Sequence, residues 1–451
     1  RLAASTTEDV HAVVQAAAKA APAWRERPMR ERAQLLGRLR VLLAERADAV
    51  AHSAALESGK TEAEARAGLE RGLEVVDFAM SLPAAELGGA LDVSRGVRCE
   101  VRREPLGVVV GITPFNFPAM VPLWMMPIAV CTGNTFILKP SDKVPMTANL
   151  LGHMAVEAGF PPGVFSIAHG DQHTVEALID HPVVQAIAFV GSTPVARSVY
   201  ARAAAQGKRA LCLGGAKNHL IVAPDADPVL TVRAVYDSFT GCAGQRCMAG
   251  SVLVTIGEAG DLVQGIIDLA SRCRLGKSMG ALIDSAARER ILGAIERAQA
   301  EGARVLFDGR RMVPPEHYRD GYWLGPTILD GVKPGTESAT RELFGPVLSI
   351  VRVDTLEEAL ALEQQSPYGN ATSIFTQSGA VARRVAEQAT SGMIGVNVGV
   401  PVPRDPFSFG GSKQSKFGQG DITGTSAVEF WTERKKVTSK WALQNDQSWI
   451  S

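Results

Sequence analysis

The sequence lacks most of the patterns that would assign it at once to a specialised class of protein. Its 47 Lys and Arg residues balance 47 Asp and Glu residues, so no excess of positive charge indicates nucleic acid or an anionic membrane as a partner. The six cysteines form no C-x-x-C pair and have no zinc-ligand spacing, which indicates free thiols in a reducing compartment and no metal site. Internal repeats and low-complexity linkers are also missing.

Residues 105–138 contain no charged side chain, so this stretch has to be compared with a membrane-spanning helix. It holds Pro105, Pro114, Pro118, Pro122 and Pro127, together with Asn116 and Asn134. So many prolines would leave backbone groups unpaired in lipid. We therefore expect a buried strand–turn–helix segment in a cytoplasmic protein. Because the sequence begins with Arg1, we expect residues ahead of it, and a targeting segment stays open.

The patterns that are present favour an α/β enzyme. The chain has 451 residues, of which 46% are hydrophobic and 21% charged, and this fits two or three globular domains. In residues 7–85, including 30–51, the apolar side chains have helical spacing. In residues 96–103 polar and apolar side chains alternate, which is typical of an exposed hairpin arm. We then expect strands at 108–112, 135–138, 164–167, 186–190, 220–222, 251–256, 350–353 and 393–398, with helices at 285–301 and 355–365. This alternation predicts doubly wound parallel sheets.

The C-terminal part carries a last alternating run. In residues 428–431 and 435–438 polar and apolar side chains alternate, which predicts a single strand. We expect this strand to pair with the arm at 97–103, in the same chain or across a subunit boundary.

A standard dinucleotide fingerprint is missing, since no G-x-G-x-x-G occurs. Two other strand-to-helix junctions could hold a dinucleotide. After the strand that ends at Val190, Ser192 could cap a helix and help to bind a pyrophosphate. The segment from Lys139 to Lys143, after another strand, suits a ribose hydroxyl. For both junctions the alternative is an ordinary capping or surface turn.

Cys247 is the strongest candidate for a catalytic residue. It follows Arg246 in a loop of small residues, and an adjacent guanidinium is expected to lower a thiol pKa that is ordinarily near ~8.5. Asn116, in the run 114–118, offers a side-chain amide that could stabilise negative charge on a carbonyl oxygen. The alternative for Asn116 is a role in its local turn.

These motifs resemble the aldehyde dehydrogenase superfamily over nearly the whole chain. The likeness rests on residues 114–118, 139–141, 189–193, 213–217, 247 and 342–347. Segments 94–97, 215–219, 244–249 and 395–403 are most similar to the CoA-acylating methylmalonate-semialdehyde dehydrogenases. The resemblance implies an NAD-binding domain (1–90 and 106–214), a catalytic domain (215–424) and a small β oligomerisation arm (91–105 and 425–445). It also implies a homo-oligomer, either a dimer or a tetramer.

The resemblance implies a role for each matching residue. Cys247 would be the nucleophile, and Asn116 with the Cys247 backbone N–H would form the oxyanion hole. Glu342 would bind the nicotinamide ribose of NAD. The other NAD contacts would come from Thr113, Phe115, Lys139, Asp142, Lys143, Ser192 and Gly214.

Two arginines would bind the carboxylate of a semialdehyde substrate, because the guanidinium matches a carboxylate in two hydrogen bonds. Arg246 lies beside the nucleophile, and Arg71 aligns with the second arginine that family members use. The alternative for Arg71 is an exposed helix charge that pairs with Glu74.

One position departs from the hydrolytic members of the superfamily. Those enzymes carry a water-activating Glu directly before Leu-Gly-Gly, and here that position is Cys212. A thiol is a poor base near neutral pH, so an acyl-enzyme would survive until an outside thiol, coenzyme A, takes the acyl group. A base relocated elsewhere is the alternative.

We therefore expect an enzyme that uses NAD and coenzyme A to oxidise and decarboxylate malonate or methylmalonate semialdehyde, giving acetyl-CoA or propionyl-CoA. The alternatives are a hydrolytic aldehyde dehydrogenase that releases a free acid and a catalytically silent dinucleotide-binding protein. The sequence leaves open whether the pathway is valine, inositol or β-alanine breakdown.

Overall fold

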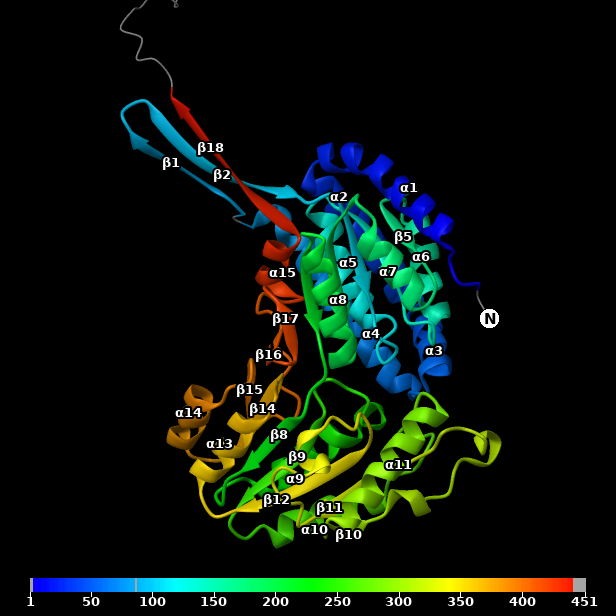
Figure 1. The fold of residues 1–451 in the computed structure, drawn as a ribbon, viewed down its shortest axis with the longest axis vertical. Coiled ribbons are helices and arrows are strands. Elements are labelled where there is room, and N and C mark those ends of the chain that lie inside the picture. Colours follow the sequence, from blue (N-terminus) through cyan, green and yellow to red (C-terminus); the bar gives the residue numbers. More distant parts are fainter. Residues whose placement is uncertain (1–2, 86, 441–451) are drawn as a thin grey trace, which may run out of the picture.

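The computed structural model describes residues 3–85 and 87–440 and confirms the predicted α/β class (Figure 1). The chain opens with the helices α1 (Thr7–Glu26), α2 (Met29–Glu45), α3 (Ala47–Ser58) and α4 (Glu62–Ser81), followed by a 3-10 turn at Leu82–Ala84. Capping boxes begin α1 and α4, where Thr6 and Thr61 exchange hydrogen bonds with an acidic residue three positions later. The helical stretch predicted at 30–51 is divided at Arg46, whose φ of −107° ends α2.

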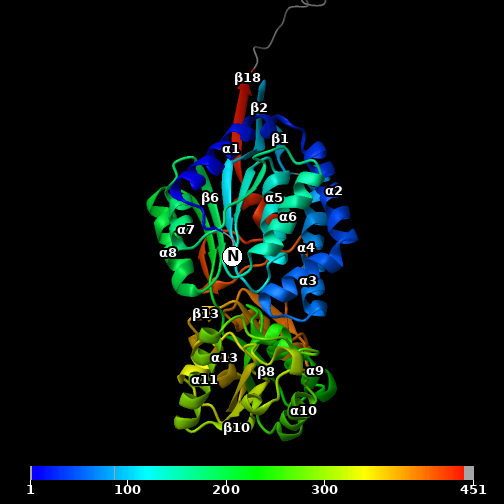
Figure 2. The ribbon, with the colours of Figure 1, turned by 90° about the vertical axis from the view of Figure 1, so that its right-hand side faces the viewer.

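The first sheet has the strand order β17-β7-β6-β3-β4-β5. Its strands are β3 (Val108–Ile112), β4 (Thr135–Lys139), β5 (Phe165–Ile167), β6 (Val184–Val190), β7 (Arg209–Leu213) and the antiparallel edge strand β17 (Lys416–Gly418). Its helices are α5 (Met120–Cys131), α6 (Pro145–Glu157), α7 (Gln172–Asp180) and α8 (Thr193–Ala205). Figure 2 shows α7 and α8 on one side of the strands and α5 and α6 on the other. Both faces are covered, which explains why β3 and β4 are buried along their whole length.

The second sheet has the strand order β10-β11-β12-β9-β8-β14-β15. Its strands are β8 (Asn218–Val222), β9 (Gly250–Ile256), β10 (Arg304–Phe307), β11 (Thr327–Asp330), β12 (Val347–Val353), β14 (Ala371–Phe375) and β15 (Met393–Val396). Its helices are α9 (Pro228–Thr240), α10 (Gly260–Ser271), α11 (Ser285–Ala300), α12 (Glu337–Thr340), α13 (Leu356–Gln365) and α14 (Gly379–Gln388). Two short strands, β13 (Tyr368–Gly369) and β16 (Ser412–Lys413), pair separately.

Two sequence predictions about strands need correction. The strand predicted at 393–398 ends at Val396. Residues 428–431, predicted as part of the last strand, belong mostly to helix α15 (Gly424–Phe430). In this helix Gly424, Ala427, Val428 and Phe430 are buried, so the apolar residues follow helical spacing that a four-residue window cannot separate from strand alternation.

A three-stranded arm projects away from both sheets in Figures 1 and 2. It consists of β1 (Gly89–Ser94), β2 (Val97–Pro105) and β18 (Thr432–Lys440), all antiparallel. The predicted pairing of the C-terminal strand with the arm is confirmed within one chain, where Val437 lies opposite Glu100. The part of the predicted arm at 441–445 lies outside the described residues.

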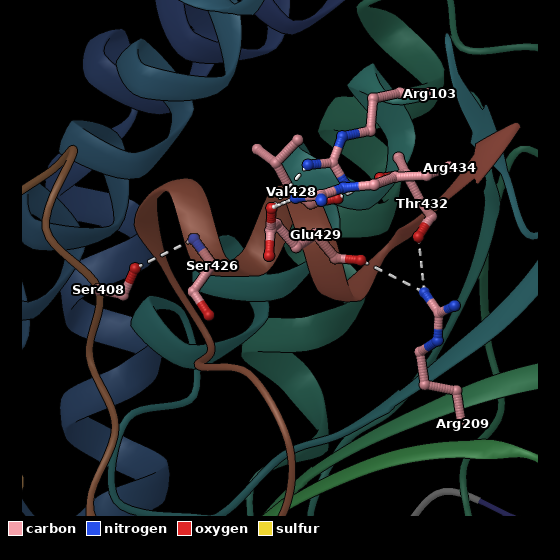
Figure 3. A network of polar contacts seen from close by, with 8 residues as sticks. All are labelled: Arg103, Arg209, Ser408, Ser426, Val428, Glu429, Thr432 and Arg434. Carbon is pink, nitrogen blue, oxygen red and sulfur yellow. Dashed lines mark hydrogen bonds and ion pairs between the residues drawn. The ribbon is translucent and has the colours of Figure 1, made fainter. Parts of the chain in front are cut away.

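A polar network joins the arm to the body of the molecule (Figure 3). Arg103 and Arg434 both donate to the Glu429 carboxylate on α15. From the first sheet, Arg209 donates to the carbonyls of Phe430 and Thr432 at 2.7 Å each. These bonds fix the end of α15 and the start of β18 against β7.

No helix among residues 3–85 and 87–440 is both long and apolar enough to cross a membrane. The uncharged stretch at 105–138 forms β3, α5 and most of β4, which belong to the first sheet and to the helices packed on it. This agrees with the buried strand–turn–helix segment that its prolines indicated.

Candidate active site

A cavity of about 900 Å³ lies between the two sheets, at the carboxyl ends of β3, β4, β6 and β7. Clefts at this edge of parallel sheets are the usual sites for dinucleotides. Ten of the predicted site residues line the cavity: Thr113, Phe115, Asn116, Lys139, Asp142, Lys143, Ser192, Gly214, Cys247 and Glu342. The fold therefore brings together residues that are more than two hundred positions apart in the chain, from Thr113 to Glu342. Arg71 and Arg246 do not line this cavity.

The candidate nucleophile Cys247 lies on a loop between α9 and β9. Ahead of it the backbone takes a left-handed turn, with φ of 54° at Cys242 and 52° at Ala243, followed by Gly244 at 69°. A left-handed conformation costs a residue with a side chain about 1–2 kcal/mol. The surrounding structure offsets this cost: Glu64 accepts from the Cys242 N–H at 2.5 Å, and the side chain of Gln245 bonds Ala281 and Ile283. The turn holds the loop in a shape that it would not adopt alone.

Two buried asparagines fix the Cys247 backbone. The side-chain amides of Asn218 on β8 and Asn370 before β14 both donate to the Cys247 carbonyl at 2.8 Å. These two residues were missed as site residues, although Asn218 lies in a segment that the resemblance singled out. Nothing in the sequence around Asn370 indicates that it reaches Cys247, because 123 residues separate them.

Asn116 lies in the same cavity as Cys247 and bonds the loop that carries it. Its side chain is 5% exposed, and its amide donates one hydrogen to the Gln245 carbonyl at 2.9 Å. The second amide hydrogen remains, and both Asn116 and Cys247 line the same cavity. The bond to Gln245 ties the amide to the loop that carries the sulfur.

The protonation state of Cys247 differs from the sequence prediction. Burial raises the pKa of the thiol to about 12, and the charge of Glu342 adds to the rise. Arg246 acts in the expected direction and lowers the pKa, but the loss of hydration outweighs it. The predicted low thiol pKa was therefore wrong for the unliganded protein. We expect the sulfur to become a thiolate only when bound ligands change its surroundings.

Glu342, just after α12, also lines the cavity. Its carboxylate accepts from the Ala216 N–H at 2.9 Å. Burial raises the pKa of Glu342 to about 7, while the Ala216 N–H, Lys217 and Arg290 lower it. The carboxylate therefore titrates close to neutral pH and can act either as an acceptor for a hydroxyl or as a base.

The far end of the cavity suits a dinucleotide phosphate. The N-terminus of the 13-residue helix α8 opens here, and the side chain of its cap residue Ser192 makes no capping hydrogen bond. The first-turn N–H groups and the helix dipole are thus free to meet an anion.

The end of β4 and the turn after it supply two lysines to the cavity. Lys139 is 6% exposed, and burial lowers its pKa, whereas Asp142 and Asp171 raise it. Lys143 instead forms an ion pair with Asp284, the N-cap of α11. The two sheets are thus connected by a charge pair at the cavity edge.

Leu213, and not Cys212, lines the cavity that Cys247 also lines. Side chains alternate along β7: Leu211 and Leu213 pack in the core that also contacts Cys247, whereas Cys212 packs with α8 on the other face. Leu213 lines the cavity and Cys212 does not. Cys212 remains the residue directly before Leu-Gly-Gly, and the structure adds that its side chain points away from the cavity; the prediction that this position lacks a water-activating carboxylate stays a prediction.

The two predicted substrate arginines are bonded elsewhere in this structure. The Arg246 guanidinium donates to the carbonyls of Asp237 and Ser238 at the end of α9, and its buried Nε has no partner among the described residues. Arg71 on α4 donates to Glu74 at 2.9 Å, which was the alternative for this residue. Their role as a carboxylate clamp stays a prediction.

Comparisons with known proteins agree with this arrangement. The model of the aldehyde dehydrogenase family matches residues 1–437. Malonate-semialdehyde dehydrogenase 1 of Geobacillus kaustophilus (strain HTA426) is 44% identical over 448 residues, which cover 98% of this chain and 91% of the relative. The crystal structure of methylmalonate-semialdehyde dehydrogenase from Oceanimonas doudoroffii superimposes with a TM-score of 0.96 at 40% identity, covering 98% of this chain and 92% of the other. A Sinorhizobium meliloti 1021 protein solved as a complex with NAD has the same TM-score of 0.96, 39% identity and the same coverage of both chains.

Proposed function

The chain belongs to the aldehyde dehydrogenase family, and from this premise we propose that it oxidises malonate or methylmalonate semialdehyde with NAD and transfers the acyl group to coenzyme A. The observation that carries the proposal is the meeting of Cys247, Asn116 and Glu342 in one cavity, together with Cys212 in place of the carboxylate that precedes Leu-Gly-Gly in hydrolytic relatives.

The residues of the cavity fit NAD. The open N-terminus of α8 suits the pyrophosphate, Lys139 and Asp142 suit the adenosine ribose, and Glu342 suits the nicotinamide ribose. Thr113, Phe115, Lys143 and Gly214 line the space between them. NAD, when bound, takes up two electrons and a hydrogen from the substrate carbon and adds a positive charge near the sulfur.

Cys247 would attack the aldehyde carbon as a thiolate and form a hemithioacetal. The second amide hydrogen of Asn116 and the backbone N–H of Cys247 would hold the oxygen as its negative charge develops. Oxidation of the hemithioacetal leaves an acyl group on the sulfur as a thioester. Because the loop is fixed through its carbonyl by Asn218 and Asn370, the sulfur keeps its position through both steps.

The thioester of a malonyl group can lose CO2, because the thioester carbonyl accepts the electron pair that the carboxylate carbon releases, and a proton then replaces the lost carboxylate. Neither Cys212 nor Leu213 offers a carboxylate that could activate water, so the acyl-enzyme waits for the thiol of coenzyme A. That thiol displaces Cys247 and leaves as acetyl-CoA or propionyl-CoA.

The test is steady-state NADH production with malonate semialdehyde, with and without coenzyme A. We expect sustained turnover only when coenzyme A is present, and none from Cys247→Ala in either condition. Sustained turnover of the wild-type protein in water alone would refute the acylating proposal but not the dehydrogenase activity.

A hydrolytic enzyme is the second candidate, because Glu342 has a pKa of about 7 and its charge acts on Cys247. A carboxylate with this pKa is a suitable base for activating water. Its existing bond to Ala216 and the proposed ribose contact argue against that use. If Glu342 were the base, Glu342→Gln would abolish CoA-independent turnover and leave NADH affinity unchanged.

The proposal also covers the oligomeric state of the protein and its location in the cell. We propose that β1, β2 and β18 mediate association into a homo-oligomer, since Leu91 and Val93 on β1 are 73% and 56% exposed. Size-exclusion chromatography with light scattering should give a dimer or tetramer, and Leu91→Lys with Val93→Lys should lower the mass. The domain limits predicted from the sequence and a cytoplasmic location are part of this proposal.

A further inference from the structure

Lys217 is a buried lysine for which the mechanism above has no use. It lies between the double glycine and β8, its side chain is 2% exposed, and its Nζ has no hydrogen-bond partner among the described residues. A buried ammonium without a partner is costly, so its presence beside the active site calls for a reason. The sequence singled out the segment 215–219 but assigned no role to this residue.

The backbone around Lys217 wraps the carboxylate of Glu342. Ala216, the preceding residue, donates its N–H to one carboxylate oxygen at 2.9 Å. Gly215 packs so closely against the other oxygen that a Cβ at this position would overlap with it. Residues 215 and 216 therefore enclose the anion with a close backbone and a hydrogen-bond donor, while the charge of the next residue, Lys217, acts on it without a direct ion pair among the described residues.

The charges around this carboxylate are unevenly buried. Lys217 is fully enclosed and interacts with Glu342 and Glu337, while burial lowers its own pKa to about 8. Arg290 on α11 is exposed and donates to the Leu343 carbonyl, and the exposed Arg341 pairs with Glu337. Cys247 and Tyr368 face Glu342 from the loop and from β13. Because water screens their charges, the two arginines stabilise the Glu342 carboxylate less than an enclosed cation does.

We propose that Lys217 is a positioning residue that holds the Glu342 side chain in place as an anion, ready to accept hydrogen bonds from the nicotinamide ribose. This inference rests on the proposed role of Glu342 in NAD binding. Lys217 itself touches neither NAD nor the substrate; it acts through the carboxylate.

The experiment is fluorescence titration of NADH binding between about pH 6 and pH 9, using the full chain without substrate. In the wild-type protein, affinity should fall as the pH drops through about 7, where Glu342 takes up a proton. Glu342→Gln should bind weakly with no such dependence. Lys217→Met should move the midpoint upward by about one pH unit and weaken binding about fivefold at pH 7, whereas Lys217→Arg should keep the midpoint.

Several results would overturn the inference. A midpoint unchanged in Lys217→Met, with affinity reduced equally at every pH, would make the lysine merely structural. A Lys217→Met change that also weakens binding in the Glu342→Gln background would indicate that it does not act through the carboxylate. If Lys217→Met does not fold, Lys217→Gln gives the same comparison. A Glu342→Gln protein with the wild-type pH profile would instead refute the proposed role of Glu342.

Discussion

Replacing Leu213 with glutamate should convert the protein from a CoA-dependent to a hydrolytic enzyme. Leu213 is 4% exposed and lines the cavity with Cys247, so a carboxylate there would be poorly hydrated and its pKa would rise toward neutrality, as that of Glu342 does. A base with such a pKa accelerates attack by water about 10²–10⁴-fold. The burial of a charge should cost about 1–3 kcal/mol of stability, which thermal unfolding would measure.

The assay is NADH production from malonate semialdehyde without coenzyme A. Leu213→Gln is the matched control, because it has the same shape without a base and should stay dependent on coenzyme A. Cys212→Ala should behave like the wild type, since that side chain packs on the other face of β7. If Leu213→Glu folds and binds NADH but hydrolyses no faster than Leu213→Gln, the side chain does not reach the thioester and the reasoning fails.

Three further predictions concern the same site. Asn116→Ala should lower kcat about 10²–10³-fold through loss of one oxyanion donor, and an unchanged kcat measured with saturating substrate would exclude that role. Arg246→Leu should raise KM for malonate semialdehyde far more than for propanal, whereas equal effects in a two-substrate comparison would argue against a carboxylate clamp. Because the pKa of Cys247 is raised to about 12, its alkylation by iodoacetamide in the unliganded protein should still be accelerating at pH 9; Glu342→Gln should speed it, and a plateau near neutral pH would contradict the structure.

Most of the fold follows from local patterns in the sequence. The capping boxes at Thr6 and Thr61 and the fully apolar strands β3 and β4 are signals that a few neighbouring residues carry. The last strand was harder, because the helix α15 and the strand β18 follow one another directly. Only the packing of Phe430 and Trp431 in the core decides where one ends and the other begins.

The sequence predicted the cavity residues whose side-chain type indicates a chemical role. It was less informative about features that depend on how the strands and loops are placed. Cys247 and Asn116 were recognisable as candidate site residues from the residues next to them in the sequence. The sequence did not indicate that the Leu213 side chain lines the cavity while that of Cys212 packs on the other face of β7, because both side chains are apolar enough to fit either core. The pKa of Cys247 depends on how deeply the sulfur is buried, which an adjacent arginine in the sequence does not reveal.

The most direct test of the account is rapid mixing of the protein with NAD and malonate semialdehyde in the absence of coenzyme A, followed by mass spectrometry of the peptide that contains Cys247. The account predicts one NADH released per active site, then a stop, with an acyl group on Cys247 that disappears when coenzyme A is added. Continued NADH formation at the initial rate with an unmodified Cys247 would contradict it.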